Sequence, residues 1–467
     1  MFSHIITPVD IIRDPLYGYI EFTDLERKIF NTPIFHRLQY IKQTPSVMYV
    51  YPSATHTRFS HSLGTMHLAG IFTERVLREE LENSDRAEIE TIVQKIRLAG
   101  LLHDIGHGPF SHVFEFHFLA KMCGLNEDDL RKVNHEVIGE EIIRNDIDGI
   151  KSIITSDTLS NNDLEEIINM IRGDPNPNDD LYKYQIVACK NTITVDILDY
   201  LARDAHHTGT KEFNLIDLPR LIQTVRMLPD EKRIAYHARA VPTLYLVWIC
   251  RYIMYLLVYY HRTVRGFDLM SGEFLYWSNK EYYNFFDENQ NKIDLDVYIQ
   301  LTDNIFGEMY RLRDNNSLKN TRRSIEKIIR RQYRAAYSIE LNGPEYYRYF
   351  MSKPIVHEEI RRDIAEKAGV DEDEIILDIP SINLPWHPYF PITHVDFYRE
   401  RDGKIEKLRE VPGLLRGLHR LGGHYMIVHV FMKEYGNEEK RDKIRKAAIE
   451  VERRIKGENN EGQLLNY

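Results

Sequence analysis

The feature that most limits the fold of this chain is an amphipathic segment that ends in a histidine–aspartate pair. Beginning at Asp85, apolar side chains recur at the spacing of one helix face, at Ile89, Ile92, Val93, Ile96 and Ala99. The next position on this face is His103, and Asp104 follows it directly. The spacing therefore predicts a helix from Asp85 to about Asp104 whose end carries an imidazole and a carboxylate toward the interior.

Helical periodicity recurs over most of the chain. With 467 residues, 43% of them hydrophobic, the chain is long enough for a large core. We expect further helices at about 135–145, 185–206, 242–264 and, with a basic face, 319–337. After Gly369 the pattern changes to short strands and a last helix, near 375–379, 394–399, 425–432 and 437–455. The sequence thus predicts a mainly α fold, with a helical core and N-terminal strands in residues 1–370 and a smaller α+β lobe in residues 371–467.

Charge and cysteine content argue against several classes of protein. The formal net charge of -10 and the pI of about 6.1 disfavour a general electrostatic grip on nucleic acid. The three cysteines lie far apart, which disfavours a disulfide framework or a thiolate zinc site. The apolar stretch 243–260 contains Arg251, so we interpret it as a buried helix rather than a membrane span. Because the first residues also lack a signal-peptide pattern, we expect a cytoplasmic protein without membrane contact.

A histidine-rich run, LLHDIGHGPFSH, surrounds the His–Asp pair at residues 101–112. A carboxylate such as Asp104 is costly to bury without a cation or hydrogen-bond donors. His107 lies four residues after His103, so it is beside the pair if the helix continues. A divalent metal satisfies this arrangement, and imidazole together with carboxylate suits Mn, Fe, Zn or Ni. The alternative is a simple buried hydrogen bond between His103 and Asp104.

Further metal ligands have to come from other parts of the chain. His61, which opens a helix, and Asp196 are the candidates. Asp196, Tyr200 and Asp204 stand at positions i, i+4 and i+8, so they share one helix face and would line a polar pocket.

Several neighbouring polar residues have structural interpretations. Asp199 and Arg203 have the spacing of a surface ion pair on a helix. We interpret His67 and His117 as structural. The pair 206–207 could form a second metal site, but histidines are also common at a helix C-terminus.

These residues occur in an order that resembles a known family. The set His61, His103, Asp104 and Asp196 matches the H…HD…D signature of the HD-domain superfamily of metal phosphohydrolases. Longer segments match in the same order, namely RLQYIKQ (37–43), HTRFSHSLG (56–64), LLHDIGHGPFSH (101–112), HE (135–136), DYLARDAHHTG (199–209) and HVDFYRE (394–400). Within the superfamily the chain is similar to the deoxynucleoside triphosphate (dNTP) triphosphohydrolases, without the SAM domain that one of them carries.

The resemblance implies both a site and a reaction. One divalent ion (Mn, Mg, Fe, Zn or Ni) would be held by His61, His103, Asp104 and Asp196. Acid–base catalysis near the α-phosphate would fall to His107, His112, His135 and Glu115, which stands where the family usually has aspartate. The substrate contacts would be Arg58 to phosphate, Gln43, Tyr200 and Asp204 to the sugar, and Tyr259 near the base. The products would be a deoxynucleoside and inorganic triphosphate.

The chain departs from the family pattern at three positions. Ile197 replaces a lysine that contacts phosphate in the SAM-linked member, so other basic residues would have to supply that charge. Asn31 and Arg13 replace residues that read an activating nucleotide there. The basic segment 319–337 nevertheless resembles the family's regulatory-nucleotide region; the alternative is a solvated basic face.

Family members assemble as symmetric homo-oligomers, so we expect a tetramer or dimer. Two other functions stay open at this point. One is an HD-type phosphohydrolase that acts on another nucleotide or phosphoester. The other is a nucleotide- or nucleic-acid-binding protein whose hydrolysis is secondary.

Overall fold

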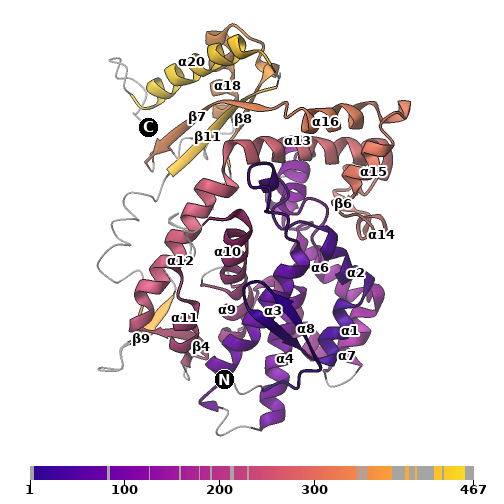
Figure 1. The fold of residues 1–467 in the computed structure, drawn as a ribbon, viewed down its shortest axis with the longest axis vertical. Coiled ribbons are helices and arrows are strands. Elements are labelled where there is room, and N and C mark those ends of the chain that lie inside the picture. Colours follow the sequence, from indigo (N-terminus) through magenta and orange to yellow (C-terminus); the bar gives the residue numbers. More distant parts are fainter. Residues whose placement is uncertain are drawn as a thin grey trace.

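A helical core lies beneath a smaller lobe that contains a sheet in the structure, a computed structural model (Figure 1). It describes residues 5–457 except 81–84, 126, 157–158, 178, 190–191, 211–214, 229–230, 344, 347–349, 351–354, 381–394, 399–404, 408–424 and 434–435. The prediction of a mainly α fold is confirmed, because helices make up most of the described chain.

The first half of the core begins with a hairpin and continues almost entirely in helices. The hairpin strands β1 (Asp10–Asp14) and β2 (Gly18–Phe22) pair antiparallel. The helices that follow are α1 (Asp24–Phe30), α2 (Pro33–His36), α3 (Arg58–Val76), α4 (Arg86–Leu102), the π-helix η4 (Phe114–Met122), α5 (Glu127–Leu130), α6 (His135–Arg144), α7 (Ile150–Thr155), α8 (Asn161–Arg172), α9 (Leu181–Val187) and α10 (Val195–Thr208).

Helix α4 forms where the apolar stripe predicts a helix. Asp85 caps its first turn by accepting a hydrogen bond from the backbone of Ala87, and Ile89, Val93 and Ile96 are buried. The helix ends at Leu102, slightly before the predicted end. The His–Asp pair therefore stands in the turn that follows the helix, pointing into the core.

Helices α3 and α10 cross so closely that one position between them has to be glycine. A β-carbon added to Gly64 would lie 1.9 Å from Oδ1 of Asp199 and 2.4 Å from Nη2 of Arg203. The single helix predicted at 185–206 is wrong, because α9 ends at Val187 and α10 begins only at Val195. Thr194 starts α10 by accepting a hydrogen bond from the backbone of Ile197.

The second half of the core is built around two long helices. They are α12 (Val241–Met254), continued by the π-helix η8 (Tyr255–Tyr259), and α13 (Arg262–Ser278). The prediction of one helix over 242–264 is therefore wrong, because the chain turns between Tyr259 and Arg262. Shorter elements complete this half: α11 (Leu218–Thr224), β3 (Val225–Leu228), β4 (Arg233–His237), η9 (Asn279–Tyr283), β5 (Phe286–Asp287), β6 (Lys292–Ile293), α14 (Leu295–Tyr298), α15 (Ile305–Arg311) and α16 (Lys319–Ile329).

One helical run among the described residues, Ala238–Tyr259, is long and apolar enough to cross a membrane by length and composition alone. In the structure three of its large apolar side chains, Leu244, Val247 and Trp248, are completely buried, whereas Leu257 is exposed. Arg251 of the same run is also buried. This packing agrees with a core helix of a folded domain.

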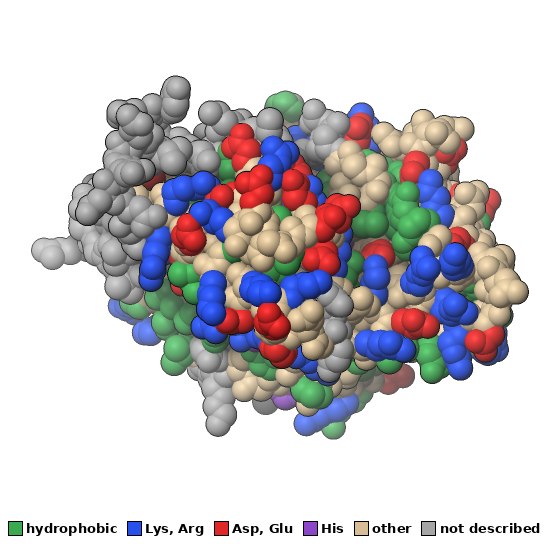
Figure 2. Space-filling view, turned by 90° about the horizontal axis from the view of Figure 1, so that it is seen from above, with side chains coloured by type: hydrophobic (Ala, Val, Ile, Leu, Met, Phe, Trp, Pro, Cys, Tyr) green, Lys and Arg blue, Asp and Glu red, His purple; other side chains and the backbone are tan. Residues whose placement is uncertain are grey.

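The basic segment forms a shorter helix than predicted. α16 ends at Ile329, Arg331 adopts a left-handed backbone conformation (φ 51°), and a strand starts at Arg334. Lys327 is paired with Glu273, whereas Arg322 and other arginines are exposed. Figure 2 shows the molecule from above, and toward the right of that view basic side chains gather but are interspersed with acidic ones.

The upper lobe is a three-stranded antiparallel sheet covered by two helices (Figure 1). Its strand order is β7-β11-β8, and its elements are β7 (Arg334–Asn342), α18 (Ile355–Ala368), β8 (Ile375–Asp378), β11 (Tyr425–Met432) and α20 (Glu438–Ile455). Two of these elements, β7 and α18, precede residue 371, where we predicted the lobe to begin. The division at that residue stays a prediction.

One strand expected in this lobe pairs elsewhere. β9 (Asp396–Tyr398) runs parallel to β4 and antiparallel to β10 (Ile405–Lys407), in a four-stranded sheet of order β10-β9-β4-β3. The predicted strand near 394–399 is thus present among its described residues, but it extends the sheet of the core rather than that of the lobe.

We predict that Gly64→Ala destabilises the fold by about 1–3 kcal/mol, because the new methyl group would push Asp199 and Arg203 out of place. Thermal or urea unfolding measures this change. Gly307→Ala is the matched control: Gly307 lies in α15 with open space around its β-carbon position, so alanine there should stabilise the helix slightly. Equal stability of the two variants would contradict the close approach of α3 and α10.

Candidate metal centre

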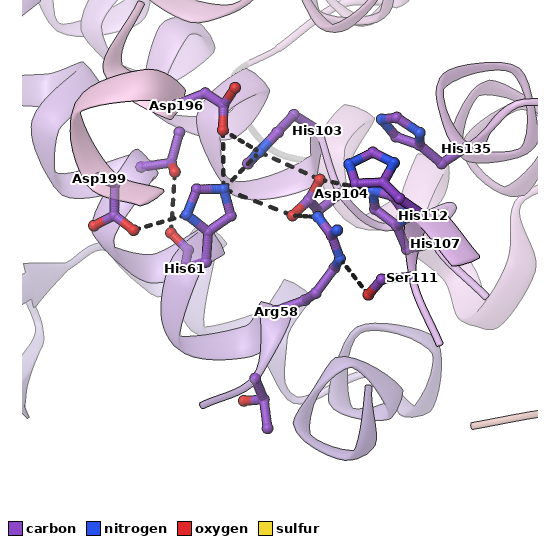
Figure 3. Close-up of polar contacts among 12 residues, drawn as sticks. Arg58, His61, His103, Asp104, His107, Ser111, His112, His135, Asp196 and Asp199 are labelled. Atoms are coloured by element: carbon purple, nitrogen blue, oxygen red, sulfur yellow. Dashed lines mark hydrogen bonds and ion pairs between the residues drawn. The ribbon is translucent and has the colours of Figure 1, made fainter. Parts of the chain in front are cut away.

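Three side chains from three different helices or turns meet at one point (Figure 3). Nε2 of His61, on α3, lies 3.2 Å from Nε2 of His103 and 3.1 Å from Oδ1 of Asp196, at the start of α10. His61 is completely buried, and His103 and Asp196 are partly exposed. The structure thus brings together three of the four metal ligands suggested by the sequence.

The hydrogen bonds behind these imidazoles fix which nitrogen faces the meeting point. Nδ1 of His103 donates to the carbonyl of Gly100, and Nδ1 of His61 donates to Asp199. In the neutral rings both Nε2 atoms therefore direct lone pairs toward each other and toward the carboxylate of Asp196. Such a set of lone pairs is stable only around a cation, and the donor types fit a divalent metal ion.

The electrostatics at His61 agree with this conclusion. Burial alone lowers the pKa of His61, but hydrogen bonds to Asp196 and Asp199, together with the charges of Asp199 and Asp104, raise it to about 10. The surroundings of this ring therefore attract a positive charge strongly.

Asp104 lies beside the meeting point and is shared among several groups. Its Oδ2 accepts a hydrogen bond from Nη1 of Arg58 at 2.7 Å and lies 3.7 Å from Nε2 of His61. Its Oδ1 lies 3.4 Å from Nε2 of His103 and 3.3 Å from Nε2 of His107. Burial raises the pKa of Asp104, but the charges of Arg58 and the two histidines hold it well below its usual range. The carboxylate is thus ionised and available as a fourth ligand.

Asp199 and Arg203 form a buried ion pair, so their prediction as a surface pair is wrong. Both side chains are completely inaccessible to solvent. Nε and Nη2 of Arg203 each donate to Asp199 at 2.9 Å, and Nη1 donates to Asp14 on the hairpin at 2.9 Å. The hydroxyl of Tyr17 donates to Asp199 as well. This network holds Asp199 against Nδ1 of His61, where it orients the ring.

A second cluster stands next to the first and centres on Glu115. Its Oε1 accepts from Nδ1 of His135 at 2.7 Å, and its Oε2 lies 2.9 Å from Nδ1 of His112. The ring of His107 stacks on that of His135 with centroids 3.9 Å apart. These four residues also offer atoms within 4.8 Å of one another, so they are a competing position for a metal ion.

The protonation preferences within this second cluster differ. Burial lowers the pKa of His135, but the charge and hydrogen bond of Glu115 raise it above its ordinary value. Burial and the charges of Arg58 and His135 hold the pKa of His107 well below the ordinary range. His112 has half of its side chain exposed, so it is the ring that an incoming ligand reaches first.

Both clusters open onto one cavity of about 900 Å³, a size typical of small-molecule sites. His61 and Glu115 stand behind its wall, and the other site residues suggested by the sequence line it: Gln43, Arg58, His103, Asp104, His107, His112, His135, Asp196, Tyr200, Asp204 and Tyr259.

The residues predicted to contact a sugar show two kinds of environment. Among the described residues, the hydroxyl of Tyr200 and Oε1 of Gln43 are buried without a hydrogen-bond partner. Asp204, in contrast, accepts from the hydroxyl of Tyr259 at 2.5 Å and lies 2.7 Å from Nε2 of His56. The tyrosine predicted to lie near a base is therefore held by its hydroxyl.

Comparison with protein-family models gives two matches along the chain. A model described as "HD domain" matches residues 58–204, and one described as "HD associated region" matches residues 216–458. The chain belongs to the HD-domain family. The first match begins and ends at Arg58 and Asp204, so it contains all four suggested metal ligands.

Curated relatives match between about half and seven-eighths of the chain. "Deoxynucleoside triphosphate triphosphohydrolase SAMHD1" of Gallus gallus is 32% identical over 445 residues, 87% of this chain and 70% of that protein. The protein of the same name from Bos taurus is 29% identical over 424 residues, 84% of this chain and 70% of that protein. An uncharacterized protein of Methanocaldococcus jannaschii is 32% identical over 263 residues, 56% of this chain and 48% of that protein.

Sequence reasoning missed several charged residues that line the cavity, among them Arg251. Arg251, on α12, lines the cavity, and its guanidinium carbon lies 5.6 Å from the ring centre of Trp248 and 5.5 Å from that of Tyr255. A single arginine in an otherwise apolar run was the available signal, but we used it only against a membrane span. Of the residues given structural interpretations, His67 contacts the ring of Tyr17, as expected of a structural residue, whereas His117 lines the cavity.

We predict that Asp199→Asn weakens metal binding about 10- to 100-fold, because the carboxylate that orients His61 is lost. Competition with a chelator whose absorbance changes when it binds metal measures the affinity of the protein for the metal ion. Asp217→Asn is the matched control, since Asp217 only caps α11 and asparagine caps equally well. Unchanged affinity in a folded Asp199→Asn protein would show that His61 needs no such support.

Proposed function

We propose that this chain is a metal-dependent dNTP triphosphohydrolase, which releases a deoxynucleoside and inorganic triphosphate. One observation carries the proposal: three of the four suggested metal ligands, His112 with Glu115 behind it, and the arginines Arg58 and Arg251 border the same cavity of nucleotide size. The names of the relatives, which match 84–87% of the chain, support it independently. A purely structural role would not require so many polar groups around one space.

The metal would be held by His61, His103, Asp104 and Asp196. When bound, a divalent ion acts as a Lewis acid toward a phosphate oxygen and the attacking water. Two imidazoles and two carboxylates suit Mn, Fe, Zn or Ni better than Mg, although Mg also accepts carboxylate ligands.

Two arginines are positioned to bind the phosphates. Arg58 uses Nη1 for Asp104 and Nε for the hydroxyl of Ser111, which leaves its other donors for phosphate oxygens. Arg251 brings a second guanidinium to the same cavity. We infer that Arg251 supplies the positive charge missing at Ile197, which borders the cavity where the family member has lysine.

His112 is the best candidate for the general acid. Its Nδ1 is held by Glu115, and its exposed side chain leaves Nε2 free to reach the leaving oxygen. Water adds to the α-phosphorus and loses a proton to the solvent, the bond from that phosphorus to the 5′-oxygen breaks, and protonated His112 gives a proton to this oxygen. The buried carboxylate of Glu115, 2.9 Å from Nδ1 of His112, orients the ring for this transfer.

The sugar would lie against Tyr200 and Gln43, whose buried polar atoms need partners. Asp204 would fix this wall through Tyr259 and His56. A regulatory nucleotide, a homo-oligomer and a cytoplasmic location stay predictions from the sequence.

We predict that the protein with Mn²⁺ converts dNTPs to deoxynucleoside and inorganic triphosphate, separable by ion-exchange chromatography. In water enriched in ¹⁸O, the label should enter the triphosphate, because water attacks the α-phosphorus. His112→Ala should lower kcat about 10²- to 10⁴-fold while the protein keeps its metal.

The matched control for that variant is His36→Ala, since His36 lies outside the cavity lining. Deoxynucleoside monophosphate and pyrophosphate as products, or label in the deoxynucleoside, would contradict the proposed reaction. No turnover of any dNTP with Mn²⁺, Mg²⁺, Fe²⁺, Zn²⁺ or Ni²⁺ would contradict the function itself.

A further inference from the structure

Part of the cavity wall has no role in the reaction proposed above. Here the lining includes Ser46, His117, Arg265 and Asp268. Nε2 of His117 lies 4.0 Å from Oδ2 of Asp268, and Nη1 of Arg265 lies 3.3 Å from the same oxygen. We call the trio His117, Arg265 and Asp268 the α13 cluster, because two of its members lie on that helix.

His117 is a buried side chain whose polar atoms are not satisfied by hydrogen bonds in the described part of the chain. It is 2% exposed, and among the described residues neither of its ring nitrogens makes a hydrogen bond. Burial and the nearby charges of Arg265 and Lys121 hold its pKa well below the ordinary range. The neutral ring therefore offers one donor and one acceptor, and leaving both unpaired would be costly unless a ligand meets them.

Arg265 and Asp268 form a charged pair that is fixed from outside the cavity. Nε and Nη2 of Arg265 donate to the two oxygens of Asp378, on β8 of the upper lobe, at 2.8 and 3.1 Å. Lys121 pairs with Asp378 from the other side. Burial raises the pKa of Asp268 to about 6, so the group is still ionised at neutral pH. A ligand at this place meets a carboxylate and a guanidinium whose positions are set in advance.

The position of the cluster in the cavity indicates which part of a nucleotide it would meet. A triphosphate at the metal centre places the sugar next and the base farthest away. Asp204, which is predicted to contact the sugar, accepts a hydrogen bond from the hydroxyl of Tyr259. The ring of Tyr255 contacts the rings of both Tyr259 and Tyr260. The α13 cluster lines the same cavity as these three tyrosines, of which Tyr259 is the residue predicted to lie near the base.

We propose that the α13 cluster reads the hydrogen-bonding edge of the substrate's base and favours guanine. Guanine alone among the four bases presents two adjacent donors, N1–H and the N2 amino group, which a carboxylate can accept with both oxygens. Its O6 is an acceptor for the guanidinium of Arg265 or the imidazole of His117. The inference rests on the proposed dNTP hydrolysis and adds a base preference to it.

The first test needs no variant. The kcat/KM of the wild-type protein is measured with dGTP, with dITP, whose base lacks only the N2 amino group, and with dTTP. Loss of one hydrogen bond to a buried carboxylate should make dITP about tenfold or more poorer than dGTP. Equal kcat/KM values for dGTP and dITP would overturn the proposal.

The second test removes the charge of the cluster. Asp268→Asn should lower kcat/KM for dGTP about tenfold, change that for dTTP little, and bring the dGTP to dITP ratio close to one. Glu273→Gln is the matched control, because Glu273 lies on the same helix but pairs with Lys327 and Tyr333 instead. An equal loss for all substrates in Asp268→Asn would mean a structural role and would overturn the proposal.

Failure of the proposed function can be told apart from failure of this inference. If the wild-type protein cleaves no dNTP, the function is contradicted, and the cluster is then tested by calorimetric binding of dGTP and dITP in the presence of Mn²⁺. Tighter binding of dGTP that is lost in Asp268→Asn would support the cluster, and equal binding would overturn it.

Discussion

The structure depends on a chain of buried charges that runs from Asp14 through Arg203 and Asp199 to His61. An unpaired charge in this position would cost several kcal/mol, so the four groups have to remain together. Their contacts fasten the N-terminal hairpin and α10 to α3, and the absence of a side chain at Gly64 lets the two helices come close enough. The same contacts aim Nε2 of His61 at the metal position. Folding and metal binding therefore share one set of interactions.

The cavity that results is graded in its chemistry. The suggested metal ligands and Arg58 come from α3, α10 and the turn after α4, Arg251 comes from α12, Tyr255 and Tyr259 come from η8, and a fixed carboxylate–guanidinium pair comes from α13. The upper lobe contributes to this last part, because Asp378 of β8 holds Arg265 in place. Among the described residues, the lobe also reaches the cavity lining through His429 of β11, whose Nε2 lies 3.0 Å from the carbonyl oxygen of Tyr260.

Much of the metal centre could be predicted from the sequence, because its ligands lie at the ends of regular helices. The stripe of α4 placed His103 and Asp104, and the helical spacing placed Asp196 and Tyr200 on one face. Asp199 and Arg203 could not be placed in the same way, since opposite charges four residues apart look the same on a surface and in a core. Breaks caused by tertiary packing were also hidden, such as the turn after Tyr259.

The central claim is that one divalent ion sits among His61, His103, Asp104 and Asp196. Crystals grown with Mn²⁺ and measured at the manganese absorption edge test it most directly. The account predicts one strong anomalous peak within coordination distance of those four side chains. A peak only among His107, His112, Glu115 and His135, or no peak in a crystal that contains the folded protein and Mn²⁺, would contradict it.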